Sequence, residues 1–320
     1  MIQLHFRACV ALVALAFPLA CLSQAYPARQ IRVIIPVSTG GTTDLIVRAM
    51  AVKMSANLGQ SVVIDNQPGA GTVVGTAAGA RAAPDGYTWV VATSGALAAA
   101  PFLYKELPFK PKDLTPVCRI GLGPYILVTN PELGVKSLAE LLAKAKTTSL
   151  SFASPGVGSS PQMAQEMFKA RTGMPFVNVP YKGTAPAVTD TMAGHTQVLF
   201  EAPAPLIPHI KSGKLVPLAM TGQRRLASVP DIPTFEELGY PGFHLAGWIG
   251  LAVPSATPAA IVARATAACQ AAVTAPDIQA LATAQGFDAD YSGPSEFAEF
   301  ITSETKKWGE LLRAAGVQPQ

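Results

Sequence analysis

The sequence predicts an α/β protein of two lobes, each a mainly parallel β-sheet flanked by helices, with two crossover strands between them. Short β-branched apolar runs alternate with helical stretches along most of the chain, which is typical of sheets covered by helices. The length of 320 residues suits about two domains of ordinary size. Two lobes joined in this way leave a cleft between them.

The predicted strands are mostly continuous apolar runs, as strands buried on both faces require. They are Ile31–Val37, Val62–Asp65, Thr88–Ala92, Ile126–Thr129, Leu150–Ala153, Phe176–Val179, Gln197–Phe200 and Val216–Met220. Helices are predicted between them and at the C-terminal end, where apolar residues share one helical face. These are Asp44–Asn57, Ser137–Lys146, Pro161–Arg171, Pro186–Met192 and Pro294–Ala315.

Two segments are expected to cross between the lobes. Pro101–Pro124 is expected to run along the edge of the first domain into the second, and the apolar stretch Trp248–Pro254 is expected to return as a strand. The predicted first domain therefore comprises residues 26–124 and 248–320. Residues 125–247 form the predicted second domain, inserted into the first.

Residues 1–25 are predicted to be a cleaved signal peptide. Arg7 is followed by an apolar run, and Ser23-Gln24-Ala25 offers small residues at the two positions that a signal peptidase reads, so cleavage is expected after Ala25. The apolar run is shorter than the ~20 residues of a membrane span, which disfavours an anchor. Lipidation at Cys21 is disfavoured because Pro18-Leu19-Ala20 is a poor lipidation signal.

Composition excludes several classes of protein. With 49% hydrophobic and 14% charged residues, the chain is not disordered. A net charge of +4, with scattered basic residues, does not indicate a nucleic-acid partner. The four cysteines form no CxxC pair, which excludes a zinc ribbon or a disulfide-rich scaffold. After signal cleavage Cys118 and Cys269 remain; pairing is open, but their distance along the chain favours two buried free thiols.

Loops of small neutral residues follow five predicted strands and lead into helices. They are Ser38–Asp44, Pro68–Thr72, Thr93–Gly95, Ser154–Pro161 and Tyr181–Thr184. The first turn of a helix carries unpaired N–H groups and a partial positive charge, and glycine allows a ligand to approach the backbone. Because ligands bind at the carboxyl ends of strands in open α/β sheets, these loops predict a site for an anion.

Each loop taken alone is equally consistent with a tight strand-to-helix turn. Asp44 has two interpretations, a helix-start residue or a cleft residue that holds a water or an ammonium group. Arg48, one turn further on, is interpreted as a solvated or paired helix residue. The recurrence of the pattern in five loops favours one shared site.

The chain lacks the motifs of common catalytic and cofactor sites. Gly69, Gly71 and Gly75 approach a dinucleotide fingerprint, but the third glycine should stand where Val74 is. The GxxxxGK[ST], HExxH and GxSxG patterns are absent, and the histidines after residue 25 are isolated. A secreted enzyme would have to rely on Asp44, Glu201, Tyr181 or Lys182. We therefore predict no catalytic set, cofactor or metal.

Short motifs recur throughout the chain, and together they match one known family. The matching segments are Tyr26-Pro27, Ile31-Arg32, Ile35-Pro36, Gly40–Asp44, Asp65–Gly71, Pro84–Thr88, Leu107–Phe109, Pro116-Val117, Pro180–Gly183, Pro186-Ala187, His209–Leu215, Pro230–Thr234 and Lys307-Trp308. In these segments the sequence resembles the tripartite tricarboxylate transporter substrate-binding proteins, known as the TctC or Bug (Bordetella uptake) family.

The resemblance implies a venus-flytrap fold in the periplasm and a monomeric receptor. It implies capture of an organic anion in the cleft, such as a di- or tricarboxylate, an acidic amino acid or an aromatic carboxylate, and delivery to membrane transporter subunits. In this family backbone groups and ordered waters hold a carboxylate through loops that match Ser38–Asp44 and Ser154–Ser160. A receptor that signals to a membrane histidine kinase is the alternative.

The sequence departs from the family pattern at the positions that would line the rest of the ligand. Val37 replaces an aromatic residue, Pro161-Gln162 lacks a histidine, and Glu201-Ala202 replaces Asp-Asn; Gln67 and Thr72 also differ. The predicted residues for the first carboxylate are Ser38, Thr39, Gly40, Gly41, Ser154, Gly158, Ser159 and Ser160. Those predicted to shape the rest of the ligand site are Ala70, Ser94, Tyr181, Glu201, Ala202 and Trp248, and Asp44 is a further predicted ligand-binding residue.

Overall fold

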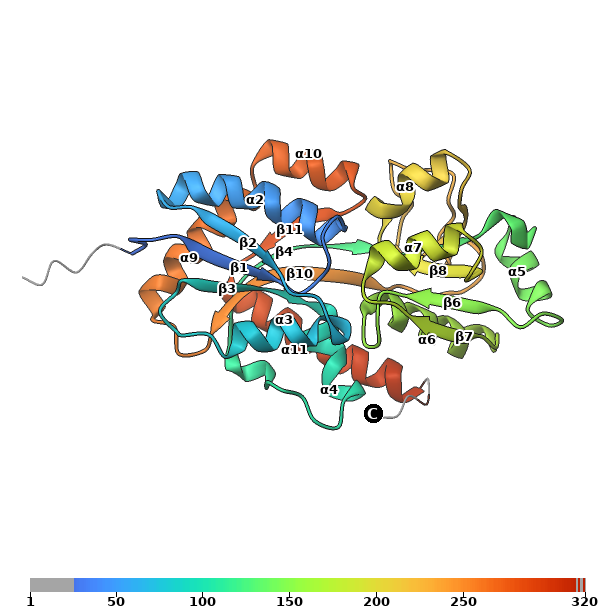
Figure 1. Cartoon of the computed structure of the whole chain (residues 1–320), viewed down its shortest axis with the longest axis horizontal. Coiled ribbons are helices and arrows are strands. Elements are labelled where there is room, and N and C mark those ends of the chain that lie inside the picture. The colour runs from blue at the N-terminus through green and yellow to red at the C-terminus, as the bar shows by residue number, and fades with distance from the viewer. Residues whose placement is uncertain (1–25, 315, 317–318, 320) are drawn as a thin grey trace, which may run out of the picture.

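The protein is described by a computed structural model that covers residues 26–314, 316 and 319. Two α/β lobes lie side by side, and two long strands connect them (Figure 1). The predicted signal peptide and Cys21 lie outside the described residues. Within residues 26–314, no helix combines the length and hydropathy that a membrane span requires.

The first lobe is a six-stranded sheet between two layers of helices. Its strand order is β11-β4-β10-β3-β1-β2. The strands are β1 (Ile31–Ile35), β2 (Val62–Asn66), β3 (Thr88–Thr93), β4 (Leu114–Pro124), β10 (Ala246–Pro254) and β11 (Asp288–Ser292). The helices are α2 (Thr42–Leu58), α3 (Val73–Ala80), α4 (Ala100–Leu103), α9 (Ala259–Val273), α10 (Pro276–Ala284) and α11 (Pro294–Ala314), with short turns η1 (Ala70–Thr72), η2 (Gly95–Ala99) and η3 (Pro111–Asp113).

The second lobe is a five-stranded sheet with the order β7-β6-β8-β5-β9. Its strands are β5 (Ile126–Thr129), β6 (Ser151–Ser154), β7 (Val177–Pro180), β8 (Val198–Glu201) and β9 (Val216–Met220). Its helices are α5 (Leu138–Lys144), α6 (Ser160–Thr172), α7 (Thr184–Met192) and α8 (Pro203–Lys211), with a short turn η4 (Pro131–Leu133). The predicted two-lobed α/β fold is confirmed.

Burial on both faces explains why the first strand is apolar at nearly every position. Ile31, Val33 and Ile35 pack in the core that includes α2, α9 and α10, whereas Ile34 packs in the core that includes α3 and α11. Successive side chains of a strand point to opposite faces, so both faces need apolar residues. Figure 1 shows these two helix layers on either side of the sheet.

The sheets contain more antiparallel pairing than the alternation of strands and helices predicts. Strands β2, β1 and β3 pair in parallel, as do β7, β6 and β8. The crossover strand β10 runs antiparallel to β3 and β4, and β5 runs antiparallel to β8 and β9. Mixed sheets follow because a chain that leaves a lobe and returns to it reverses its direction.

The segment Pro101–Pro124 does not follow the edge of the first lobe, as the sequence analysis expects. Its first residues complete the short helix α4, and β4 lies inside the sheet between β11 and β10. The edge is taken by β11, which the sequence analysis does not predict. Its Asp288 and Asp290 are exposed, and Ala289 and Tyr291 are half-buried, so it lacks the continuous apolar run of an inner strand.

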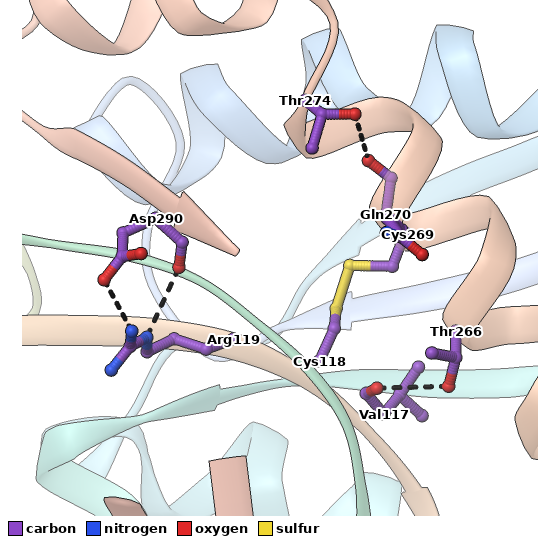
Figure 2. Close-up of a disulfide and its surroundings, with 8 residues drawn as sticks. All are labelled: Val117, Cys118, Arg119, Thr266, Cys269, Gln270, Thr274 and Asp290. Atoms are coloured by element: carbon purple, nitrogen blue, oxygen red, sulfur yellow. Dashed lines mark hydrogen bonds and ion pairs between the residues drawn. A yellow bond between two sulfur atoms is a disulfide. The ribbon is translucent and has the colours of Figure 1, made fainter. Parts of the chain in front are cut away.

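The prediction of two free thiols is wrong, because Cys118 and Cys269 form a disulfide. Their Cα atoms are 6.6 Å apart although 151 positions separate them in the sequence. Helix α9 packs across β4, and the Thr266 hydroxyl donates a hydrogen bond to the Val117 carbonyl at 3.1 Å (Figure 2). This packing brings the two cysteines together, and distance along the chain carries no information about it.

Candidate ligand-binding cleft

A cavity of about 510 Å³ lies between the two lobes. The first lobe lines it with the loops that follow β1, β2 and β3, and the second lobe with the loops that follow β6, β7 and β8. Residues at the crossings, Gly123–Tyr125 and Gly247–Ile249, line it between the lobes. This volume falls within the range typical of small-molecule sites.

Five helices begin at this cavity, two from the first lobe and three from the second. Their N-cap residues are Gly41 (α2), Thr72 (α3), Ser159 (α6), Gly183 (α7) and Ala202 (α8). The Ser159 hydroxyl accepts a hydrogen bond from the Gln162 N–H, whereas the other four N-cap residues make no side-chain capping bond. First-turn N–H groups of these helices therefore remain free for a ligand, in a region of positive potential, although Pro203 and Pro205 leave α8 only the N–H of Ala204 in its first three positions.

The Asp44 carboxylate binds neighbouring groups of the protein around the first loop, not the cavity. This carboxylate is only 3% exposed, and it accepts hydrogen bonds from the Gly40 N–H at 3.0 Å, Arg48 Nε at 3.0 Å and Asn66 Nδ2 at 2.9 Å. Burial alone would raise the pKa of Asp44, but the hydrogen bonds from Arg48, Gly40 and Asn66 outweigh burial and lower it. Asp44 thus fixes the loop before α2, and Arg48 is paired as predicted.

The segment from Gly69 to Thr72 has unusual backbone geometry. All four residues have positive φ, including Ala70 at 43° and Thr72 at 86°. Such conformations are costly for residues with a Cβ atom and occur mostly at functional sites. Two hydrogen bonds hold Thr72 in place, one between its hydroxyl and that of Thr93 at 3.0 Å and one from the Thr76 hydroxyl to its carbonyl at 2.8 Å.

The lobes touch where this segment meets the loop before α6. A Cβ atom on Gly71 would lie 2.1 Å from the Val157 carbonyl oxygen, so only glycine permits this approach. The Ser94 and Ser160 hydroxyls join the lobes at 2.7 Å. The Tyr104 hydroxyl lies 3.2 Å from both the Ala70 and the Val157 carbonyl oxygens, one in each lobe. The structure is therefore a closed arrangement of the lobes.

Tyr125, at the first crossing, packs beneath these contacts. Its side chain is buried, and burial raises the pKa of the Tyr125 hydroxyl far above its usual range, against hydrogen bonds with Ser160 and Ser94 that lower it. A Cβ atom on Gly247, in the second crossing strand, would lie 1.9 Å from the Tyr125 hydroxyl oxygen. The neutral phenol thus fills the space between the two crossings.

The cavity lining also includes Thr184, Glu201, Trp248 and Phe287, whose side chains differ in size and polarity. Glu201 is 4% exposed; its Oε1 accepts the Ala202 N–H at 2.7 Å, and its Oε2 has no partner among the described residues. Burial raises the pKa of Glu201 to about 7, against the opposing effects of the Ala202 N–H and of the nearby Thr184 hydroxyl, which does not reach Oε2 in hydrogen-bond geometry. Within the same described part, Thr42 Oγ1 and Trp248 Nε1 are also buried without a partner.

The structure places most of the predicted site residues at the cavity. Those that line it are Ser38, Gly41, Ala70, Ser94, Ser159, Ser160, Tyr181, Glu201, Ala202 and Trp248. The others lie behind this surface or beside it: Thr39 and Gly40 are exposed, and Asp44, Ser154 and Gly158 are buried. The Gly158 N–H already donates to Gln162 Oε1 at 2.6 Å.

Sequence reasoning missed Tyr125, Phe287 and Ile249 as lining residues. Tyr125 and Ile249 lie in the crossings, and Phe287 precedes the unpredicted strand β11. Thr184 ends one of the predicted loops, which is a signal that would have found it. Within the lining, Lys182 is the one basic side chain and is exposed, and arginine is absent. Within residues 26–314, no cluster of His, Cys, Asp or Glu is placed to hold a metal.

Comparison with known proteins identifies the family. The model of the tripartite tricarboxylate transporter family receptor, TctC, matches residues 46–317. The chain belongs to this family. It is 36% identical over 313 residues to protein BugT of Bordetella pertussis, an alignment that covers 97% of this chain and 95% of BugT.

Solved structures of the family have the same fold. The periplasmic binding protein BugD superposes with a TM-score of 0.88 at 30% identity, over 92% of this chain and 100% of that chain. Rpa4515 from R. palustris, solved with adipate, gives the same TM-score of 0.88 at 30% identity and covers 92% of this chain and all of its own. The predicted family and the prediction of a binding protein rather than an enzyme are confirmed.

Proposed function

We propose that this receptor captures an organic carboxylate between its two lobes and delivers it to a tripartite tricarboxylate-type membrane transporter. The observation that carries the proposal is the meeting of five helix starts, four without a side-chain cap, at one cavity without arginine. Free N–H groups at helix starts bind carboxylates without a guanidinium. The adipate bound to Rpa4515 supports a carboxylate ligand.

Because the hydrogen-bond donors come from both lobes, a bound carboxylate both gains affinity and holds the lobes together. Each hydrogen bond to a charged group contributes about 1.5–3 kcal/mol, so four or five of them, less the ordering costs, correspond to a dissociation constant of roughly micromolar. A carboxylate that contacts both lobes binds the closed arrangement more tightly than an open one. It therefore stabilises closure, which a transporter can recognise.

The disulfide supports a location outside the cytoplasm. Structural disulfides persist in oxidising compartments such as the bacterial periplasm, and Cys118–Cys269 is buried in the first lobe.

The candidate ligands of this receptor are di- and tricarboxylates, acidic amino acids and aromatic carboxylates.

Thermal unfolding in the presence of these carboxylates tests the proposal. The purified protein is first stripped of bound solute by unfolding and refolding, and the released solute is identified by mass spectrometry. At least one carboxylate should raise the midpoint of unfolding by several degrees, since a ligand at about 100 times its dissociation constant adds about 2.7 kcal/mol. If no carboxylate stabilises the protein and no organic anion is released, the proposal fails.

A further inference from the structure

Glu201 is the one acidic side chain among the cavity-lining residues, and one of its two carboxyl oxygens has no hydrogen-bond partner within the described residues. Strand β8 ends at Glu201, opposite Ile126 of β5, and α8 begins just after it. The backbone N–H of Ala202 occupies Oε1 at 2.7 Å, while Oε2 is buried and unpartnered within the described residues. A buried polar atom without a partner costs free energy, so a partner from the cleft would relieve that cost.

The neighbouring ionisable groups do not neutralise Glu201. Tyr125 is buried and neutral, and the Tyr181 hydroxyl donates to Asp190 Oδ2 at 2.7 Å. Lys182 is exposed and makes no ion pair within residues 26–314. A molecule in the cleft therefore meets Glu201 as either a buried anion that needs a donor or a neutral acid that has acquired a proton.

We infer that Glu201 selects a carboxylate whose second polar group is a hydrogen-bond donor, a hydroxyl, amide or ammonium group, and rejects a second ionised carboxylate. This inference rests on the proposed function and narrows its ligand class. A donor satisfies Oε2 directly. A second carboxylate at the same place is an acceptor of like charge, so its binding requires that one proton be taken up and shared by the two groups.

The two ligand types therefore differ in their response to pH. Burial raises the pKa of Glu201 to about 7, so the group is largely protonated at pH 6 and largely ionised at pH 8.5. Because only the protonated form accepts a second carboxylate, the affinity for a dicarboxylate should fall by about tenfold or more between pH 6 and 8.5. The affinity for a ligand with a donor should not fall in this way.

The test uses isothermal titration with matched pairs of probes, at pH 6.0 and 8.5 and in two buffers of different ionisation enthalpy. The pairs are succinate with 4-hydroxybutyrate, adipate with 6-hydroxyhexanoate, and benzene-1,4-dicarboxylate with 4-hydroxybenzoate. The proteins are the wild type, Glu201→Gln, which can donate and cannot ionise, and Glu166→Gln as a control. Glu166 is a half-buried glutamate on α6 whose pKa burial also raises, and it lies outside the cavity lining.

At pH 8.5 the wild type should bind the hydroxy acid of a pair at least ~10-fold more tightly than the dicarboxylate, and the gap should narrow at pH 6.0. At pH 8.5 dicarboxylate binding should take up about one proton in the wild type and in Glu166→Gln, and at pH 6.0, where Glu201 is already largely protonated, the uptake should be small. In Glu201→Gln the proton uptake should vanish, and the two probes should bind within about threefold of each other.

Equal binding of both probes at pH 8.5 by the wild type would overturn the inference, as would unchanged preference and proton uptake in Glu201→Gln. If Glu201→Gln fails to fold, the uptake of a proton when the wild type binds a dicarboxylate at pH 8.5 still tests the inference, and its absence would contradict it. If both probes of a pair bind the wild type equally well at pH 8.5, the role of Glu201 is excluded while the proposed capture of a carboxylate still stands. If no probe in the set binds any of the three proteins, the proposed function is wrong for these classes of carboxylate and the inference fails with it.

Discussion

The cleft is made of two unlike parts. Its backbone part consists of the helix starts at Gly41, Thr72, Ser159, Gly183 and Ala202, which offer N–H groups from both lobes. Its side-chain part consists of Thr184, Glu201, Trp248 and Phe287. The backbone part can bind any carboxylate because every residue except proline carries an N–H. The side-chain part changes with each substitution, so selectivity among carboxylates resides there.

The backbone part should be very sensitive to an added methyl group where the lobes meet. A Gly71→Ala substitution places a Cβ atom 2.1 Å from the Val157 carbonyl oxygen, so the loops must separate. We expect the affinity for the carboxylate that best stabilises the wild type to fall by at least ~100-fold, which is about 2.7 kcal/mol, in a calorimetric titration.

Gly59→Ala is the matched control for this substitution. Gly59 also has a positive φ of 69°, but a Cβ atom there meets nothing within 4 Å. Both variants should lose about 1 kcal/mol of folding stability from the backbone conformation. Only Gly71→Ala should lose affinity; an equal effect of the two substitutions would mean that the close approach of the lobes does not matter for binding.

Removal of the disulfide should separate stability from binding. The Cys118–Cys269 bond lies in the first lobe and closes a long loop that contains the whole second lobe, and neither cysteine lines the cavity. The double variant Cys118→Ala/Cys269→Ala should lose about 2–5 kcal/mol of unfolding free energy in denaturant titrations. Its affinity for the ligand should stay within about threefold of the wild-type value. A large loss of affinity would show that the disulfide is needed to shape the cleft.

Asp44 should matter for binding although it lies behind the cavity surface. Asp44→Asn leaves Arg48 without its charged partner and weakens the bond that fixes Gly40, so we expect affinity to fall by about 10-fold. Asp277→Asn, which removes an exposed partner of Lys53, should leave affinity unchanged. Equal affinities in both variants would assign Asp44 no part in shaping the loop.

The same residue gives a prediction for acid. Because the folded protein lowers the pKa of Asp44, its contribution to stability is fully present above the unfolded pKa of about 3.9 and is lost as the pH falls through the lower, folded value. Urea unfolding below pH 4 should therefore show a steeper loss of stability in the wild type than in Asp44→Asn. Parallel curves would contradict this assignment.

The smallest effect is expected for Tyr104→Phe. The hydroxyl of Tyr104 lies 3.2 Å from a carbonyl oxygen in each lobe, and its loss removes a contact between the lobes without adding bulk. We expect binding to weaken by about 3- to 10-fold, which corresponds to roughly 1 kcal/mol. Tyr240→Phe, in the second lobe and outside the cavity lining, should have no effect, and an unchanged affinity in Tyr104→Phe would exclude its role in closure.

The sequence predicted the loops of the backbone part and, in the side-chain part, Glu201 and Trp248, but it missed Phe287 and the neighbouring lining residue Tyr125. A strand, a run of small residues and a helix start are local signals, so the loops around Gly41, Ala70, Ser159 and Tyr181 could be found without a structure. Phe287 and Tyr125 reach the cavity only through pairing of β4, β10 and β11, which no local pattern encodes.

Contacts between distant segments account for the remaining differences. The bond between Asn66 and Asp44 joins the end of β2 to the start of α2, and it gives Asp44 a role inside the loop. The disulfide depends in the same way on the packing of α9 over β4. Pairing of this kind follows from tertiary structure, whereas hydrophobic periodicity reports only which elements form.

The most direct test of carboxylate capture compares the best-binding carboxylate with its methyl ester in calorimetric titrations of the wild-type protein. The ester keeps the carbon skeleton of the ligand and one carbonyl oxygen, adds one methyl group, and removes the charge that the helix starts bind. We predict that the ester binds at least ~100-fold more weakly, since hydrogen bonds to a charged group are roughly twice as strong as neutral ones. Equal affinity for acid and ester would contradict capture of an anion by backbone donors from both lobes.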